Sequence, residues 1–249
     1  MPTSEAAGAA QVPTSEAAGV ANDAAATPLD AVATAFKAAE PGNARADCRE
    51  HAPTSRVEVL CVCTGNVARS PAAERLLGKA LGPFGVRVTS AGTGAPQGAP
   101  IAPQMDERLL ACGIDARDHQ ARWLTEAEVQ RADLVLGMAR EHRSRAVELV
   151  PSALRRSFTL LGFAAIARAV PATELAQAAA SDHPADRLRA LIQLAPRYRP
   201  LSGSDEIDDP VDCDVATYAR VFAEIESAVA AIAAVVTATA DDPVPSQNS

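Results

Sequence analysis

A β-branched, mostly apolar run at residues 57–62 most constrains the fold of this chain, because it predicts a buried strand. A helical pattern follows from Arg69 to Leu81, and strand and helix patterns then alternate. Such alternation favours an α/β fold, a parallel sheet with helices on both faces. The other expected strands are 86–89, 133–138 and 157–161. The other expected helices are 103–112 closed by Gly113, one begun by a Thr125–Glu128 capping box, 140–149, alanine-rich helices in 163–200 interrupted by prolines, and 214–236.

The two ends of the chain differ from the part between them. The heptapeptide PTSEAAG occurs at residues 2–8 and again at 13–19, and two copies are too few for a solenoid. Its composition predicts that residues 1–54 form a disordered low-complexity tail, with one short amphipathic helix possible at 29–39. A docking role for this tail is the alternative. We expect one domain at 55–238 and a disordered C-terminal tail at 239–249.

The composition excludes several classes of protein. Of the 249 residues, 48% are hydrophobic, so a sizeable core can form, while the net charge of −8 argues against a nucleic-acid partner. No run of ~18 apolar residues occurs, and no basic segment precedes an apolar one at the start, so neither a membrane association nor a secretory signal is expected. The five cysteines are irregularly spaced, which favours a reducing, cytoplasmic location. Cysteines and histidines show no metal-ligand spacing, so we expect no metal and no cofactor.

The segment CTGNVARSP joins the first strand to the first helix. It places Cys63 and Arg69 at the carboxyl edge of the sheet, where α/β folds bind ligands. Between them, Thr64, Gly65, Asn66, Val67 and Ala68 can turn their backbone N–H groups around one anion, and the helix start adds positive charge. Arg69 can clamp two phosphate oxygens, and the same positive features favour a thiolate at Cys63. This arrangement predicts nucleophilic attack by Cys63 on a phosphate and a phosphocysteine intermediate.

Other residues of the segment suit a tight loop. Gly65 permits positive φ and close approach, and Asn66 tolerates the left-handed region. Ser70 can hydrogen-bond the thiolate and assist its departure, and Pro71 is compatible with a first helical turn. A cysteine and an arginine at this spacing are common by chance, so the prediction depends on the strand before them and the helix after them.

With these residues in place, the sequence resembles the low-molecular-weight protein tyrosine phosphatase family from about residue 57 to 232. The matching segments, in the family's order, are CTGNVARSP, TSAGT at 89–93, HQARWL at 119–124, ADLVLGM at 132–138 and DDP at 208–210. The resemblance implies a four-stranded parallel, flavodoxin-like sheet. It also implies that Cys63 is the nucleophile, that Arg69 binds phosphate and that Ser70 assists the cysteine. Asn66 is then held in a strained conformation by Ser70, Ser90 and His119.

The resemblance assigns the general acid to Asp209, which directly precedes Pro210. A phenolate leaving group needs a proton and the attacking water then needs a base, and one carboxylate can serve both steps. Nearby Asp205, Glu206 and Asp208 are expected to crowd Asp209 with like charge and favour its protonated form. Acidic loops are more often only solvated, and the acid role is favoured here because the Cys63–Arg69 pair is present.

This sequence departs from the family pattern in three places. Ala68 stands where many members have a second cysteine, so protection of Cys63 by a disulfide is not expected, and Cys61 is interpreted as a core residue. The stretches 94–98 and 211–212 lack the aromatic residues that members often have at the rim of the site. The resemblance implies hydrolysis of phosphotyrosine-type phosphomonoesters, with a phosphorylated protein or a small phosphomonoester as substrate. A cleft without aromatic walls would bind phosphotyrosine less well, so a different substrate stays open.

Three alternative functions stay open. An arsenate reductase of the same fold needs resolving cysteines, and Cys112 and Cys213 are single, so an external thiol would have to act. A protein-arginine phosphatase is the second alternative, but relatives of that type carry threonine where this chain has Val67. A non-catalytic phosphate-binding module is the third, and the intact Cys63, Arg69 and Asp209 argue against it.

Overall fold

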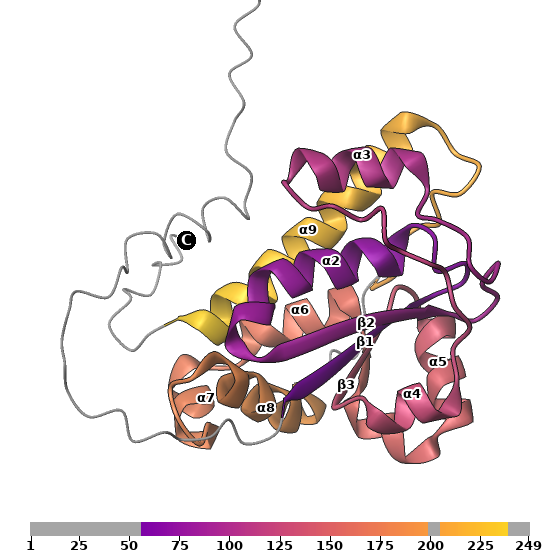
Figure 1. Ribbon diagram of the computed structural model, residues 1–249. Coiled ribbons are helices and arrows are strands. Elements are labelled where there is room, and N and C mark those ends of the chain that lie inside the picture. The colour runs from indigo at the N-terminus through magenta and orange to yellow at the C-terminus, as the bar shows by residue number, and fades with distance from the viewer. Residues whose placement is uncertain (1–55, 199–204, 239–249) are drawn as a thin grey trace, which may run out of the picture.

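The computed structural model describes residues 56–198 and 205–238. The predicted tail 1–54, with its short helix at 29–39, and the predicted C-terminal tail 239–249 lie outside the described residues. The sheet, the helices around it and the candidate site lie within them (Figure 1).

Four parallel strands form the sheet, in the order β2-β1-β3-β4. They are β1 (Val57–Cys63), β2 (Val86–Gly92), β3 (Leu134–Gly137) and β4 (Ser157–Thr159). The register pairs Cys63 with Gly92, Val62 with Gly137, and Gly137 with Thr159, so the carboxyl ends of all four strands meet at one edge. The predicted four-stranded parallel sheet is confirmed, and its order is that of flavodoxin-like folds.

Helices cover both faces of the sheet, as predicted. One face carries α2 (Arg69–Leu81), α3 (Pro103–Ala111), α6 (Leu160–Ala169) and α9 (Val215–Thr237), and the other carries α4 (Glu126–Arg131) and α5 (Arg140–Leu149) (Figure 1). The remaining helical segments are α7 (Ala172–Ala178), α8 (Pro184–Leu194) and the short 3-10 turns η1 (Gly82–Phe84), η2 (Pro151–Arg156) and η3 (Ala195–Arg197).

Strand β1 divides two hydrophobic cores. Val57, Val59 and Cys61 point into the larger core beneath α2 and α9, while Leu60 and Val62 point into the smaller core beneath α4 and α5. Alternate side chains of a strand point to opposite faces, so a central strand is apolar wherever it is buried, and Glu58 of β1 is only partly buried. This burial fixes β1, and with it the position of Cys63.

Local signals set most of the boundaries. The Thr125–Glu128 capping box is present, and Gly113, at φ 71°, follows α3 as expected. The prediction of a strand over 157–161 is wrong at its end. Thr159 Oγ1 accepts the Gly162 N–H at 3.2 Å and so caps α6, which begins at Leu160.

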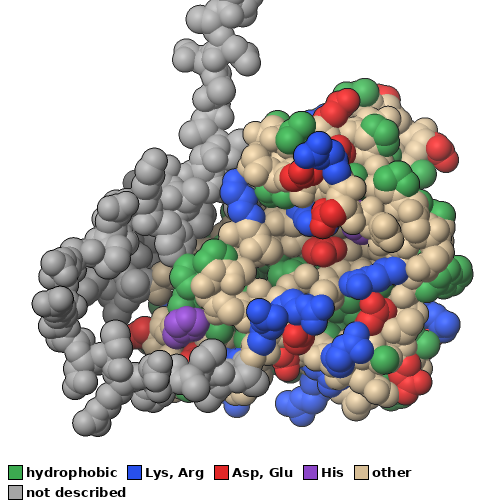
Figure 2. All heavy atoms as spheres, viewed as in Figure 1, with side chains coloured by type: hydrophobic (Ala, Val, Ile, Leu, Met, Phe, Trp, Pro, Cys, Tyr) green, Lys and Arg blue, Asp and Glu red, His purple; other side chains and the backbone are tan. Residues whose placement is uncertain are grey.

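Charged side chains of both signs lie on one face of the protein. Figure 2 shows arginine and lysine side chains interleaved with aspartate and glutamate on the face that it displays. Over residues 56–198 and 205–238, no helix has both the length and the apolar character needed to cross a bilayer.

Candidate active site

Cys63 ends β1 and Arg69 begins α2, and we call the segment between them the 63–69 loop. The Cys63 side chain is buried, and its Sγ accepts the Asn66 backbone N–H at 3.2 Å. The Ser70 hydroxyl lies 2.9 Å from the same sulfur. Two hydrogen-bonding groups thus converge on Sγ just before the start of α2.

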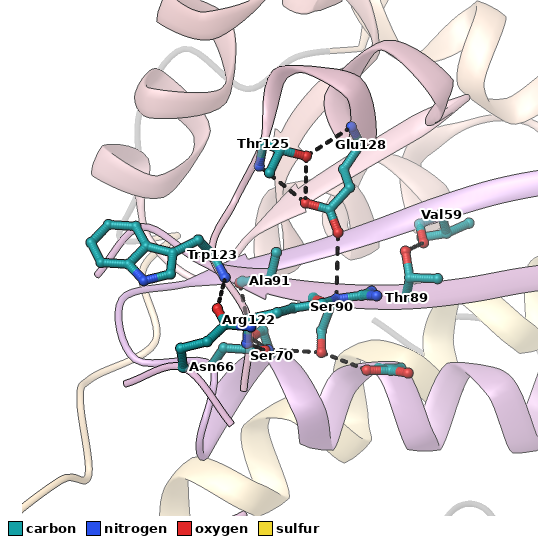
Figure 3. Close-up of polar contacts among 12 residues, drawn as sticks. Val59, Asn66, Ser70, Thr89, Ser90, Ala91, Arg122, Trp123, Thr125 and Glu128 are labelled. Atoms are coloured by element: carbon teal, nitrogen blue, oxygen red, sulfur yellow. Dashed lines mark hydrogen bonds and ion pairs between the residues drawn. The ribbon is translucent and has the colours of Figure 1, made fainter. Parts of the chain in front are cut away.

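Asn66 is the most constrained residue of the loop. Its φ of 51° lies in the left-handed region, and its Nδ2 donates to Ser70 Oγ at 3.1 Å and to Ser90 Oγ at 2.8 Å. Its Oδ1 accepts the Arg122 backbone N–H at 2.9 Å, and its carbonyl oxygen lies 2.7 Å from His119 Nε2. Figure 3 shows Asn66, Ser70, Ser90 and Arg122 close together beside the start of α2. The structure therefore brings together the predicted supporting residues, and it adds Arg122.

A second set of polar contacts continues from Ser90 toward α4 (Figure 3). Ser90 Oγ donates to the Glu74 carboxylate, and Arg122 Nε donates to the Ser90 carbonyl oxygen at 2.7 Å. The same Nε lies 3.4 Å from Glu128, the residue that completes the α4 capping box. The sequence analysis assigned no role to Glu74 or Arg122. The one indication for Arg122 was its place in the HQARWL segment, which matches the family.

The end of β2 packs tightly against the loop. Thr93 N–H donates to Cys63 O and Gly94 N–H to Thr64 O, both at 2.9 Å. A Cβ on Gly92 would lie 2.5 Å from Thr64 O and 3.0 Å from Asn66 Cβ, so only glycine fits there.

Of the two properties expected to suit Gly65 to the loop, close approach and positive φ, the structure shows the first and not the second. Asn66 adopts the left-handed conformation instead, and Gly65 is not among the residues with positive φ. A Cβ at Gly65 would lie 3.3 Å from Val67 Cγ2, so close packing favours a residue without a side chain at this position. Val67 is partly exposed, and Ala68 is buried and precedes α2.

Arg69 connects the loop to a distant segment. Its side chain is 5% exposed, Nη1 donates to the Ile207 carbonyl oxygen at 3.1 Å, and Nη2 forms an ion pair with Asp209. The Asp209 side chain is 46% exposed. Tyr218 lies near it: burial, and next the charge of Asp209, raise the pKa of the Tyr218 phenol. The structure thus brings Asp209 to the 63–69 loop across 140 positions of sequence.

The predicted crowding of like charges around Asp209 is weaker than the sequence suggests. Asp208 pairs with Arg220 at 2.9 Å, and Asp205 pairs with Arg140 at 2.7 Å. Asp208 and Asp205 therefore each have a cation that offsets their repulsion of Asp209, while the Glu206 carboxylate accepts the Arg140 backbone N–H at 3.3 Å.

His142 is a buried residue of the site that sequence reasoning missed. It occupies the first turn of α5, where its Nδ1 accepts the Ala139 backbone N–H at 3.0 Å. Its Nε2 lies 2.9 Å from Thr64 Oγ1. Burial, and next the charge of Arg69, lower the pKa of His142 to about 4.

Two further side chains bear on earlier expectations. Cys61 is fully buried, and burial raises the pKa of its thiol well above the ordinary value, as expected for a core residue. Trp123 is 51% exposed, and its backbone N–H donates to Gln97 Oε1 at 3.4 Å. An aromatic residue from a different segment therefore adjoins the 94–98 stretch. Within the described residues, no three His, Cys, Asp or Glu side chains are grouped so as to hold a metal ion.

Comparison with known proteins bears directly on this geometry. The pattern that describes the "Low molecular weight phosphotyrosine protein phosphatase" family matches residues 58–173. The chain is 34% identical over 114 residues to the low molecular weight protein-tyrosine-phosphatase Wzb of Salmonella typhi, covering 46% of this chain and 74% of that protein. The chain belongs to the low molecular weight phosphotyrosine protein phosphatase family. Cys63, Arg69, Ser90 and His119 lie within the matched region of this chain, and Asp209 lies beyond it.

Other relatives of this chain differ in the substrate that their names give. A protein-arginine-phosphatase of Geobacillus stearothermophilus is 38% identical over 105 residues, covering 42% of this chain and 70% of that protein. The probable low molecular weight protein-tyrosine-phosphatase EpsP of Ralstonia solanacearum is 49% identical over 80 residues, which are 32% of this chain and 54% of EpsP. The chain thus spans about half the length of EpsP.

Solved structures support the fold. The YwlE arginine phosphatase from Geobacillus stearothermophilus superposes with a TM-score of 0.53 at 27% identity, covering 71% of this chain and 90% of that one. The low molecular weight protein tyrosine phosphatase from T. tengcongensis gives 0.51 at 28% identity, with coverage of 70% and 95%.

Proposed function

We propose that this phosphatase hydrolyses phosphotyrosine-type phosphomonoesters through a phosphocysteine intermediate. The observation that carries the proposal is the convergence of the Asn66 N–H and the Ser70 hydroxyl on Cys63 Sγ, with Arg69 paired to Asp209 beside them. Cys63 is the nucleophile, Arg69 the phosphate clamp and Asp209 the acid and base.

In the first step the Cys63 thiolate attacks phosphorus, the P–S bond forms and the P–O bond to the leaving group breaks. The Arg69 guanidinium and the backbone N–H groups of residues 64–68 bind the phosphoryl oxygens, where negative charge concentrates. Asp209, in its protonated form, gives its proton to the leaving oxygen. Its side chain is partly exposed, so a leaving group can reach it.

In the second step water attacks the phosphocysteine, and Asp209 accepts the proton that the water loses. The P–S bond breaks and the electron pair returns to Cys63 Sγ. The Ser70 hydroxyl, 2.9 Å from that sulfur, stabilises the departing thiolate. Asn66, held by Ser90 and His119, keeps the loop closed around the anion through both steps.

The proposed substrate is a phosphorylated protein or a small phosphomonoester. We also propose a reducing, cytoplasmic compartment, since the mechanism needs Cys63 as a free thiolate. Dephosphorylation of protein arginine is the second candidate, favoured by the 38% identity to a protein-arginine-phosphatase. The partly exposed Val67, where arginine-specific relatives are expected to carry threonine, favours the phenyl phosphate.

The test is a comparison of substrates with purified protein. Turnover is measured on p-nitrophenyl phosphate, a phosphotyrosine peptide, phosphoarginine, and arsenate with a thiol donor. The proposal expects turnover of both aryl phosphates and its loss in Cys63→Ser. Aryl phosphate turnover that survives Cys63→Ser contradicts the mechanism. Faster turnover of phosphoarginine establishes the second candidate, and arsenate reduction without phosphate hydrolysis overturns both.

A further inference from the structure

His142 is a buried, titratable side chain that the two-step mechanism does not use. It sits where α5 leaves the carboxyl end of the sheet, and its side chain is 1% exposed. Its Nδ1 accepts the Ala139 N–H, so in the neutral ring the proton must be on Nε2. The N–H of Nε2 then donates to Thr64 Oγ1, 2.9 Å away. A second acceptor, Glu141 Oε1, is farther away at 3.4 Å and belongs to an exposed side chain.

Thr64 is held from two directions. Its hydroxyl accepts from His142 of α5, and its carbonyl oxygen accepts from Gly94 N–H beyond β2. It directly follows Cys63, so its backbone N–H is the first of those that surround the bound phosphoryl group. A shift of the Thr64 backbone would redirect that N–H.

We propose that His142 is a positioning residue of the 63–69 loop: its Nε2–H holds Thr64 so that the loop stays aligned with the phosphoryl group. The inference rests on the proposed phosphatase function. The His142–Thr64 hydrogen bond connects α5, which packs on the smaller core, to the 63–69 loop. The other support for this loop comes from β2 and from residues 119–122.

The role requires a neutral ring. The charged groups that face His142 are Arg69, which opposes a second positive charge, and Asp209 and Glu141, which favour one. Burial and Arg69 outweigh the acids, and the pKa near 4 keeps the ring neutral over the working range of a phosphatase. Because Nδ1 of His142 accepts the Ala139 N–H, the neutral ring donates from Nε2 alone, and this donor fixes the orientation of the Thr64 hydroxyl.

The test compares two replacements of His142. Gln can place its amide N–H near the position of Nε2, whereas Asn can accept the Ala139 N–H but is too short to reach Thr64. We expect His142→Asn to lower kcat about tenfold, the upper range for one hydrogen bond, and His142→Gln to recover most of this loss. In a Thr64→Val background, His142→Asn should change kcat by less than about twofold, because the partner hydroxyl is already gone. Equal losses in both backgrounds overturn the inference.

A second measurement does not depend on turnover. Nitrogen NMR of ring-labelled histidine in the full chain reports which ring nitrogen of His142 carries the proton. We expect protonation on Nε2 alone between about pH 5 and about pH 8. A ring protonated on Nδ1, or on both nitrogens, contradicts the inference. An inactive wild-type protein with the expected NMR signal would refute the proposed function and leave the placement of His142 supported.

Discussion

Asn66 is the residue on which the shape of the 63–69 loop depends most directly. A non-glycine residue at φ 51° is disfavoured, and the contacts with Ser70, Ser90, His119 and the Arg122 backbone compensate for it. Sequence reasoning could predict this residue, because asparagine tolerates the left-handed region and the motif is local. It could not predict Arg122, because its contact with Asn66 is made through its backbone N–H and its side chain donates to a backbone carbonyl oxygen, that of Ser90, which residue types do not reveal.

Asp209→Asn should lower kcat on phenyl phosphates by about 10²-fold, because the leaving oxygen then receives no proton in the transition state. The loss should be smaller for p-nitrophenyl phosphate, whose leaving group is less basic. Steady-state kinetics on a series of aryl phosphates measures this dependence. Asp208→Asn is the matched control, since Asp208 is exposed and pairs with Arg220 away from Arg69. Equal effects of the two variants contradict the assignment of the acid.

Gly92→Ala should lower kcat/KM by about 10²-fold, because the new Cβ would lie 2.5 Å from Thr64 O and displace the loop. Gly94→Ala is the control, since its Cβ would have an ordinary 3.8 Å contact with Thr64 Cγ2. Kinetics of both variants, with circular dichroism to verify folding, provides the comparison. A folded Gly92→Ala protein with wild-type kcat/KM would show that the close packing of β2 does not set the loop geometry.

At the scale of elements, residue patterns predicted the helix bounds that are set by local signals such as apolar spacing and caps. The bounds of α2 and α5 are as expected, because apolar spacing defines both helices. The predicted boundary between β4 and α6 was wrong because the two leucines after Thr159 are compatible with a strand or a helix. The hydrogen bond from Gly162 N–H to Thr159 Oγ1 caps α6, so these leucines are helical. His142 was missed for a different reason, since a histidine in a first helical turn carries no local sign of a partner 78 positions away.

Gly78→Ala in α2 should raise the free energy of unfolding by about 0.5–1 kcal/mol, because alanine restricts the unfolded chain more than glycine does. A Cβ at Gly78 meets nothing within 4 Å, so no packing cost opposes the gain. Urea denaturation of the variant and the wild type measures the difference, and kcat should be unchanged. A decrease in stability would mean that α2 is constrained at this turn by something other than its own propensity.

At the scale of the whole molecule, the sheet topology assembles the site from segments that are far apart in sequence. Because β1 is central, the 63–69 loop can contact α5 on one side and the segment before α9 on another. Sequence reasoning located Asp209 only through family resemblance, since 140 positions separate it from Arg69. The acidic residues around it could not be paired with Arg140 and Arg220 before the fold was known.

The stability of the protein should fall as the pH drops from 6.5 toward 4. The pKa of His142 is about 4 in the folded protein and 6.5 ordinarily, so the unfolded chain binds a proton first as pH falls. Stability that His142 contributes above pH 6.5 is therefore lost progressively down to about pH 4. Urea denaturation across this range, on the wild type and His142→Gln, isolates the contribution. An identical pH dependence in both proteins contradicts a buried neutral His142.

The central claim is that Cys63 carries the phosphoryl group between the two steps. Asp209→Asn should slow hydrolysis of the intermediate, so this variant is mixed with p-nitrophenyl phosphate, stopped in denaturant within its first turnover and digested for mass spectrometry. The account predicts one phosphoryl group, attached to the Cys63 sulfur, in an amount that matches the first burst of p-nitrophenol. A burst of p-nitrophenol with the phosphoryl group on another residue, or on none, would contradict it.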